Sequence, residues 1–171
     1  LILWTWMFFI YNRNIKLYEE SSHDELTQLK ESLDNKGNIL VNLVSRISPA
    51  ALISLDMYTL DIIASEVLED DEVMSIEILG KEKEQLLSKK KDEDGFPVVY
   101  FEKEVKTDKE KHDAEMITGK IRIGMSTSNY KKTETRNAEN IVAVRKKMVF
   151  SFILITVFIT ILISITIILV R

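Results

Sequence analysis

Residue types that commonly carry chemistry are scarce in this chain of 171 residues. It has no Cys, which excludes disulfides, thiol catalysis and Cys-ligated zinc. Its 2 histidines, His23 and His112, have no second ligand at a metal-binding spacing, and its 5 glycines form no phosphate-binding loop. No Ser-His-Asp set or catalytic pair of carboxylates can be defended either. We therefore expect no enzymatic activity, no catalytic residue and no cofactor within this chain.

Four aspartates are further candidates for a metal site. Asp70, Asp71, Asp92 and Asp94 lie in two acidic runs and carry the oxygen ligands that Ca²⁺ prefers. Their spacing does not match an EF-hand loop, so we interpret them as solubilising surface residues and predict no metal. The net charge of −4 and the lack of a long basic stripe also argue against a nucleic-acid partner.

Ligand binding is a possibility that the sequence leaves open. A small-molecule site needs a concave apolar wall with a few converging polar groups. The candidates near the predicted sheet are Tyr58, Tyr100, Glu102 and Arg122. Strand alternation places Tyr100, Glu102 and Arg122 opposite the most apolar faces, so solvent exposure is the alternative interpretation. A sensor driven by a partner protein or by the membrane is equally compatible with the sequence.

The most apolar segment predicts a membrane span. Residues 148–170 contain no charged residue, Gly or Pro. A helix of this length crosses the roughly 30 Å of bilayer hydrocarbon. Basic residues 145–147 and Arg171 flank it, where their side chains reach lipid headgroups. We therefore predict a transmembrane helix over residues 148–170.

A second apolar run occupies residues 1–11, which is too short to span a bilayer. The chain begins with Leu1 rather than Met, and Trp4, Trp6 and Tyr11 suit the aromatic belt of a membrane interface. We therefore expect a truncated first transmembrane helix here, and two spans in all. Basic residues beside both spans favour a cytoplasmic polar region, but this rule weakens for long translocated regions. Charge alone therefore leaves the orientation open.

The apolar pattern of residues 12–47 is helical. Apolar residues recur every seven positions, with two more placed three residues after the first and the third: Leu26, Leu33, Leu40, Ile47, Leu29 and Leu43. A strict seven-residue repeat favours a coiled coil with a second helix, and a helix lying on its own domain is the alternative. We expect both, with a second copy of the chain near the membrane and the domain further on. Gly37 weakens this helix by about 1 kcal/mol relative to Ala.

Residues 48–126 are expected to form a small α+β domain. A short helix follows Ser48, a predicted N-cap, and a second helix follows the cap Asp56. One face of that second helix is apolar: Met57, Leu60, Ile63, Ala64 and Val67. Alternation then predicts strands at residues 73–79, 84–88, 98–105 and 116–126, joined by a turn and by solvated loops at residues 88–95 and 106–115.

The predicted strands should form an antiparallel, PAS-like sheet with the long helix and the short helices packed on one face. In the last strand, Ile117, Ile121, Ile123 and Met125 are expected to share the buried face. A polar helix over residues 127–147 then leaves the domain and leads into the second span. The sheet domain is thus flanked by helices that continue into membrane segments.

Three segments carry a resemblance to a known class of receptor: KGNILVNLVSRI (residues 36–47), the stretch from residue 52 to residue 80, and GKIRIGMSTS (residues 119–128). Their succession resembles the extracytoplasmic sensor region of bacterial transmembrane receptors. These receptors are histidine kinases, chemoreceptors and diguanylate cyclases with a PAS-like or single-CACHE-like domain. The resemblance covers most of residues 36–128.

The resemblance implies a homodimeric receptor in the bacterial inner membrane, with the sensor domain outside. The juxtamembrane and transmembrane helices would form the dimer, lipid would surround the spans, and a small molecule or a protein would be the ligand. The exit helix and the second span would pass the change to a cytoplasmic output module that is missing from this sequence. The alternative is a non-signalling membrane-anchored adaptor that binds a protein partner.

Overall fold

The computed structural model of the chain describes residues 2–92, 95–107 and 116–170. The chain divides into two compact units. Gln28–Lys131 form the first, which we call the sheet unit, and Leu1–Thr27 with Lys132–Arg171 form the second, the helical unit. Asp94, His112 and most of the expected loop at residues 106–115 lie outside the described residues.

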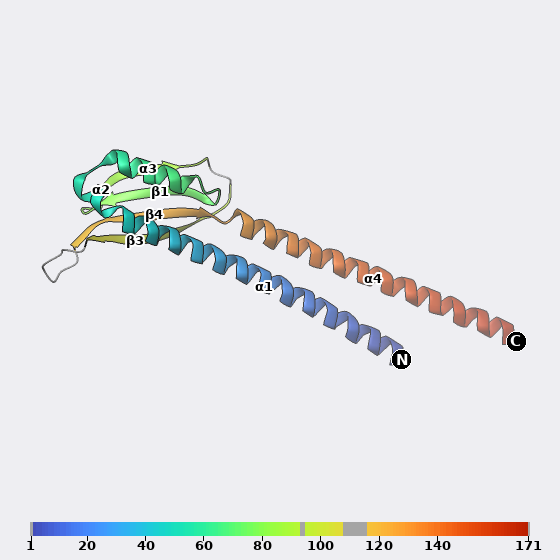
Figure 1. Cartoon of the computed structure of the whole chain (residues 1–171). Helices are drawn as coiled ribbons and strands as arrows, with labels where there is room; N and C mark the ends of the chain where they lie inside the picture. Colours follow the sequence, from blue (N-terminus) through green and yellow to red (C-terminus); the bar gives the residue numbers. More distant parts are fainter. Residues whose placement is uncertain (1, 93–94, 108–115, 171) are drawn as a thin grey trace. The chain divides into compact units, whose positions relative to one another are not determined.

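The sheet unit contains one antiparallel sheet with the strand order β2-β1-β4-β3 (Figure 1). Its strands are β1 (Val73–Gly80), β2 (Gln85–Lys90), β3 (Val98–Thr107) and β4 (Met116–Ser126). The predicted α+β class and the small antiparallel sheet are thereby confirmed. β2 extends beyond the strand expected at residues 84–88, because Lys89 and Lys90 pair with Ile76 and Ser75 along the ladder.

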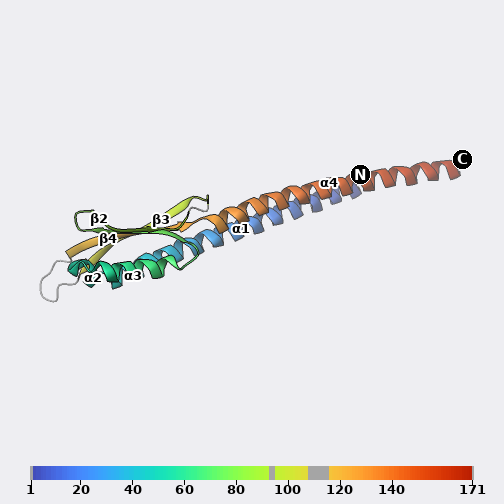
Figure 2. The same cartoon turned by 90° about the horizontal axis from the view of Figure 1, so that it is seen from above.

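Three helical segments cover one face of this sheet (Figure 2). They are α2 (Pro49–Ser54), α3 (Met57–Leu68) and the final turns of α1 (Ile2–Ile47). Within the part of the sheet unit that the structure describes, no helix lies over the other face, which we call the open face.

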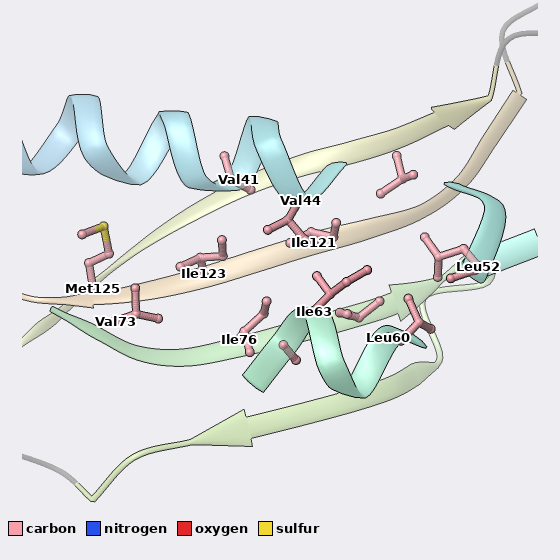
Figure 3. Packing of buried hydrophobic residues seen from close by; sticks show 14 residues of the cluster. Val41, Val44, Leu52, Leu60, Ile63, Val73, Ile76, Ile121, Ile123 and Met125 are labelled. Carbon is pink, nitrogen blue, oxygen red and sulfur yellow. The ribbon is translucent and has the colours of Figure 1, made fainter. Parts of the chain in front are cut away.

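Apolar side chains from the sheet and the helices form one core between the two layers (Figure 3). Its members alternate along β1 and β4 and line one side of each helix: Val41, Val44, Ala51, Leu52, Leu60, Ile63, Ala64, Val73, Ile76, Ile78, Val105, Ile121, Ile123 and Met125. Burying a side chain of this size contributes about 1.5–3 kcal/mol relative to leaving it in water. The core therefore holds the helices on the sheet.

Gly37 allows α1 to approach the sheet closely. A Cβ atom at this position would overlap Cδ2 and Cε2 of the Phe101 ring in β3. Only glycine leaves room for that ring without moving the helix or the strand. Gly37, which weakens α1 locally, therefore also allows this helix to pack closely on the sheet.

The seven-residue seam of α1 divides between two environments. Leu33 and Leu40 pack against the core, as expected for a helix that lies on its own domain. Leu43 and Ile47 of the seam are 52% and 49% exposed, and Ile39, which lies outside the repeat, is 65% exposed. Because these three residues stand four apart, they share one side of the helix. We call them the α1 stripe.

The two predicted helix caps have different outcomes. Asp56 caps α3 as expected, since its Oδ1 accepts a hydrogen bond from the Thr59 amide at 3.1 Å. Ser48 is the N-cap residue of α2 and Pro49 is the first residue of that helix, as predicted, but Ser48 makes no side-chain capping bond. Its hydroxyl donates to the Val44 carbonyl at 2.6 Å, and its backbone stays helical at φ −84° and ψ −15°. Ser48 therefore extends the last turn of α1 and does not cap α2 with its side chain.

Two residues expected in the core lie at the surface. Ile117 is 42% exposed and Met57 is 41% exposed. The β3–β4 register shifts between Val105 and Lys106, so that Ile117 pairs with Lys106 and leaves the buried face. Met57 is the first residue of α3, one turn before the buried Leu60.

The helical unit contains the first part of α1 and most of α4 (Ser128–Val170). Charged side chains join the two helices. The Glu25 carboxylate accepts hydrogen bonds from Arg136 at 3.0 Å and from Asn137 at 2.9 Å, and Glu19 pairs with Arg145 at 2.6 Å. Because α4 has no break, the exit helix and the second span predicted from the sequence are parts of one helix.

Within the described residues, α4 is the one helix that is long and apolar enough to cross a membrane. Its most apolar window has a mean hydropathy of 3.0, and none of that window is buried. The hydroxyls of Thr156 and Thr160 donate to carbonyls of α4 itself, both at 2.8 Å, and do not reach another helix. The described part of α1 has no stretch that is both long and apolar enough, so the structure supports one candidate span.

A core substitution in β4 should destabilise the sheet unit far more than the same substitution at an exposed site of that strand. Ile121→Ala is expected to lower the free energy of unfolding by about 2–5 kcal/mol, because it leaves a cavity at a fully buried position. Ile117→Ala is the matched control, with an expected loss below about 1 kcal/mol. Hydrogen exchange of the β1 and β4 amides in the detergent-solubilised chain measures both, and equal losses would contradict this placement of Ile117.

Candidate functional site

Three of the four predicted ligand residues meet on the open face of the sheet. Glu102 in β3 and Arg122 in β4 are direct register partners, and Arg122 Nε donates to Glu102 Oε1 at 2.5 Å. The guanidinium carbon of Arg122 lies 5.9 Å from the centroid of the Tyr100 ring. This distance is within the range of a cation–π contact.

Two further residues complete this group, which we call the Arg122 cluster. Glu77 in β1 is the register partner of Arg122 on its other side, and its Oε2 accepts from Arg122 Nη1 at 3.1 Å. The Lys120 ammonium pairs with the second oxygen of Glu102. Alternation in the sequence places Glu77 on the polar side of its strand. It does not show which strands are neighbours or how they are registered, so the sequence did not predict Glu77 and Lys120 as members of this cluster.

The charges of the Arg122 cluster stabilise one another. Hydrogen bonds from Lys120 and Arg122 hold the pKa of Glu102 below its ordinary value. The same bond to Glu102, together with the charge of Glu77, raises the pKa of Arg122. Two carboxylates and two cations balance, so the cluster offers an incoming ligand no unpaired charge. The arrangement is that of a polar sheet surface whose charged side chains already form ion pairs with one another.

Tyr58 lies apart from the Arg122 cluster. It is 77% exposed at the start of α3, and α3 packs on the opposite face of the sheet. The four candidates from the sequence therefore do not form a single site.

A second charged group involves the acidic run before β1. Lys36 Nζ in α1 donates to Asp70 Oδ1 at 2.8 Å and to Glu72 Oε2 at 2.6 Å. The other Glu72 oxygen accepts from Asn129 Nδ2, in the first turn of α4, at 3.0 Å. Burial raises the pKa of Asp70, but hydrogen bonds from Lys36 and the Glu72 amide outweigh it, and the pKa falls below its ordinary value. The interpretation of Asp70 as merely solubilising is therefore wrong.

A hollow of about 300 Å³ lies beside the Arg122 cluster. Ser75 of β1 and Tyr100 of β3 line it, and both flank Gly124 of β4 in the ladder. Register partners point to the same side of a sheet, so this hollow opens on the open face. In the part of the chain that the structure describes, no group of three or more His, Asp or Glu side chains is placed to hold a metal ion.

The chain matches no known protein-family model, and no curated protein sequence is significantly similar to it.

The ion pairs of Glu102 predict a pH-dependent contribution to stability. Because the pKa of Glu102 is lowered on folding, its contribution is fully present above its ordinary value of 4.5 and is lost as the pH falls through the lower, folded value. The stability advantage of the wild-type chain over Glu102→Gln should therefore shrink between about pH 5 and pH 2. Hydrogen exchange or thermal unfolding across this range measures the difference.

Glu104→Gln is the matched control for this experiment. Glu104 lies two residues further along β3, and it has no ion pair with any residue that the structure describes. The difference between the wild-type chain and Glu104→Gln should change less over the same pH range. An advantage over Glu102→Gln that is the same at all pH values would contradict the assignment.

Proposed function

We propose that this chain is the extracytoplasmic sensor portion of a bacterial transmembrane signalling receptor in the inner membrane. The observation that carries the proposal is the continuity of α4, which begins just after β4 and runs without a break into the apolar segment. A change in the sheet unit therefore has a covalent helical path to the membrane. The resemblance of residues 36–47 and 119–128 to sensor regions supports the same proposal.

We further propose that the apolar first turns of α1 also enter the membrane, giving two spans. Trp6 and Phe9 are 69% and 66% exposed in the helical unit, as expected for side chains that face lipid. The Glu19–Arg145 pair joins α1 to α4 immediately before the apolar segment. Both helices would then emerge from the bilayer at the same level.

A second copy of the chain is the proposed partner of the α1 stripe. Leu43 and Ile47 belong to the seven-residue repeat that favours pairing with another helix. The same helix already uses its other side to cover the sheet through Val41 and Val44. A homodimer would cover the apolar side chains that the sheet unit leaves exposed.

The proposed mechanism is a shift between two arrangements of the dimer. A ligand or partner shifts such an equilibrium only by its difference in affinity for the two states. The shift would pass along α4 to a cytoplasmic output module beyond this sequence. Ligand binding would thus change the position of α4 relative to α1 in the membrane.

Cysteine labelling tests the orientation. Because the chain has no native Cys, a single Lys81→Cys in the turn between β1 and β2 is a clean reporter. A membrane-impermeant maleimide should label it in intact cells. Ile163→Cys, in the apolar segment, is the control and should stay unlabelled before and after lysis without detergent. Protection of Lys81→Cys until lysis would place the sheet unit in the cytoplasm and overturn the sensor proposal.

Disulfide crosslinking tests the dimer. Leu43→Cys lies on the α1 stripe and should form a crosslinked dimer under mild oxidation in membranes. Asn38→Cys is the matched control, since it is also exposed but lies about 140° around the helix. It should crosslink little. Equal crosslinking of both variants, or none of either, would exclude the α1 stripe as the dimer interface.

A further inference from the structure

The helices of the sheet unit carry most of its exposed apolar side chains. Among the described residues of this unit, the strands contribute Val99, Tyr100 and Ile117. The helices and the turn between α2 and α3 contribute the rest: Ile39, Leu43, Ile47, Ile53, Leu55, Met57, Tyr58 and Ile62. The first three are the α1 stripe, and we call the other five the corner patch. Exposed apolar patches of this kind mark interaction surfaces.

The corner patch lies outside the core of the sheet unit. Tyr58 and Ile62 stand four apart on α3 and are 77% and 41% exposed. The buried residues of the same helix, Leu60, Ile63 and Ala64, lie on its opposite side. No member of the corner patch belongs to the buried core. Packing within the sheet unit therefore does not explain these side chains.

Leu55 is held in an unfavourable backbone conformation. It ends α2 with φ 54° and ψ 36°, in the left-handed region that a bulky residue rarely adopts. Glycine is the usual residue at such a helix end, because it has no Cβ atom to clash. The Leu55 side chain is 61% exposed, so burial in the core does not offset this strain. A strained apolar residue at the surface points to a contact outside its own fold.

The α1 stripe is too small to hold two sheet units together by itself. Specific interfaces bury about 800 Å² on each partner. Even an aromatic side chain supplies only about 150–250 Å² when it is buried. The three aliphatic side chains of the stripe therefore fall short of this area. The corner patch follows the stripe in the chain and lies on the same helical layer (Figure 2), so it supplies further surface.

The charges near the corner patch suit a contact between identical surfaces. Near a two-fold axis a residue meets its own copy, so an unpaired charge would face a like charge. Residues 53–62 contain two charged side chains, Asp56 and Asp61. Asp56 accepts a hydrogen bond from the Thr59 amide at 3.1 Å, and Asp61 pairs with Lys89 at 2.7 Å. Both charges are thus engaged, and the patch offers a second copy an apolar surface.

We propose that the corner patch is a contact between two copies of the chain. Leu55 and Tyr58 of each copy pack on the helical layer of the other copy, beside the α1 stripe. This proposal extends the proposed homodimer and rests on it. It also explains why position 55 carries an apolar side chain in a conformation that favours glycine: the side chain is buried by the partner.

Energy transfer between labelled copies in lipid vesicles tests this contact. Lys90→Cys, an exposed position on β2, carries a donor dye on one half of the full-length chains and an acceptor dye on the other. Stepwise dilution with lipid gives the dissociation constant of the dimer. Leu55→Gly should weaken the dimer at least about fivefold, because it removes an apolar side chain from the interface.

The same variant should not destabilise the fold. Hydrogen exchange of the β1 and β4 amides is measured at high dilution, where the chain is monomeric. Leu55→Gly should be at least as protected as the wild-type chain, because glycine relieves the strain at this position. Protection lowered as far as in Ile121→Ala would show that Leu55 stabilises its own fold, and would overturn the proposal.

Lys83→Gly is the matched control. Lys83 also has a positive φ, 66°, but it is an exposed residue in the turn between β1 and β2. Its substitution relieves strain in the same way and should leave the dimer unchanged. Tyr58→Ser is a second variant of the corner patch. Because it leaves the backbone in an ordinary helical conformation, its weaker dimer would report the lost side chain alone.

The outcomes separate this contact from the homodimer itself. Weaker dimers in Leu55→Gly and Tyr58→Ser, with wild-type affinity in Lys83→Gly, support the proposal. Wild-type affinity in both corner variants would overturn it, and the homodimer through the α1 stripe would stand if Leu43→Cys crosslinks. The absence of energy transfer between wild-type copies at every dilution would exclude the homodimer and the corner contact together.

Discussion

The close approach of α1 to β3 at Gly37 is the steric contact on which the sheet unit depends. The Phe101 ring occupies the space that any side chain at position 37 would need. One and two turns further on, Val41 and Val44 are 2% and 0% exposed because the helix lies close to the sheet. The same approach brings the neighbouring Lys36 to the acidic run before β1. The absence of a side chain at position 37 therefore permits both the close packing of α1 on the sheet and the ion pairs of Lys36.

The period of two along the strands then separates the two faces of the sheet. Ile76, Ile78, Ile121 and Ile123 point to the helices, and the residues between them point to the open face. On that face, charge pairing and a missing side chain produce two different surfaces. The charged groups of the Arg122 cluster bind one another, whereas at Gly124 the side chains of Ser75, Val98 and Tyr100 pack closely over the backbone of β4. Residues that look equally suited to ligand binding in the sequence are thereby distinguished by their neighbours.

Local patterns predicted the elements of this protein well, because they depend on residues close in sequence. The alternation in β1 and β4, the Asp56 cap and the uncharged apolar segment of α4 are of this kind. The predictions that failed depend on residues that are distant in the sequence and become neighbours only in the folded chain. Ile117 leaves the core through a register shift, and Glu77 joins Arg122 only because β1 pairs with β4. The sequence likewise placed Tyr58 with residues that lie on the opposite face.

The two oxygens of the Glu72 carboxylate hold residues of two different helices. Oε2 accepts from Lys36 of α1, and Oε1 accepts from Asn129 in the first turn of α4. The backbone carbonyl of Glu72 also accepts from the Ser126 amide at the end of β4, at 2.8 Å. A displacement of this loop must therefore break or carry along contacts with both helices. Under the proposed mechanism, in which α4 shifts relative to α1, the mechanical connection would therefore lie in the sheet unit.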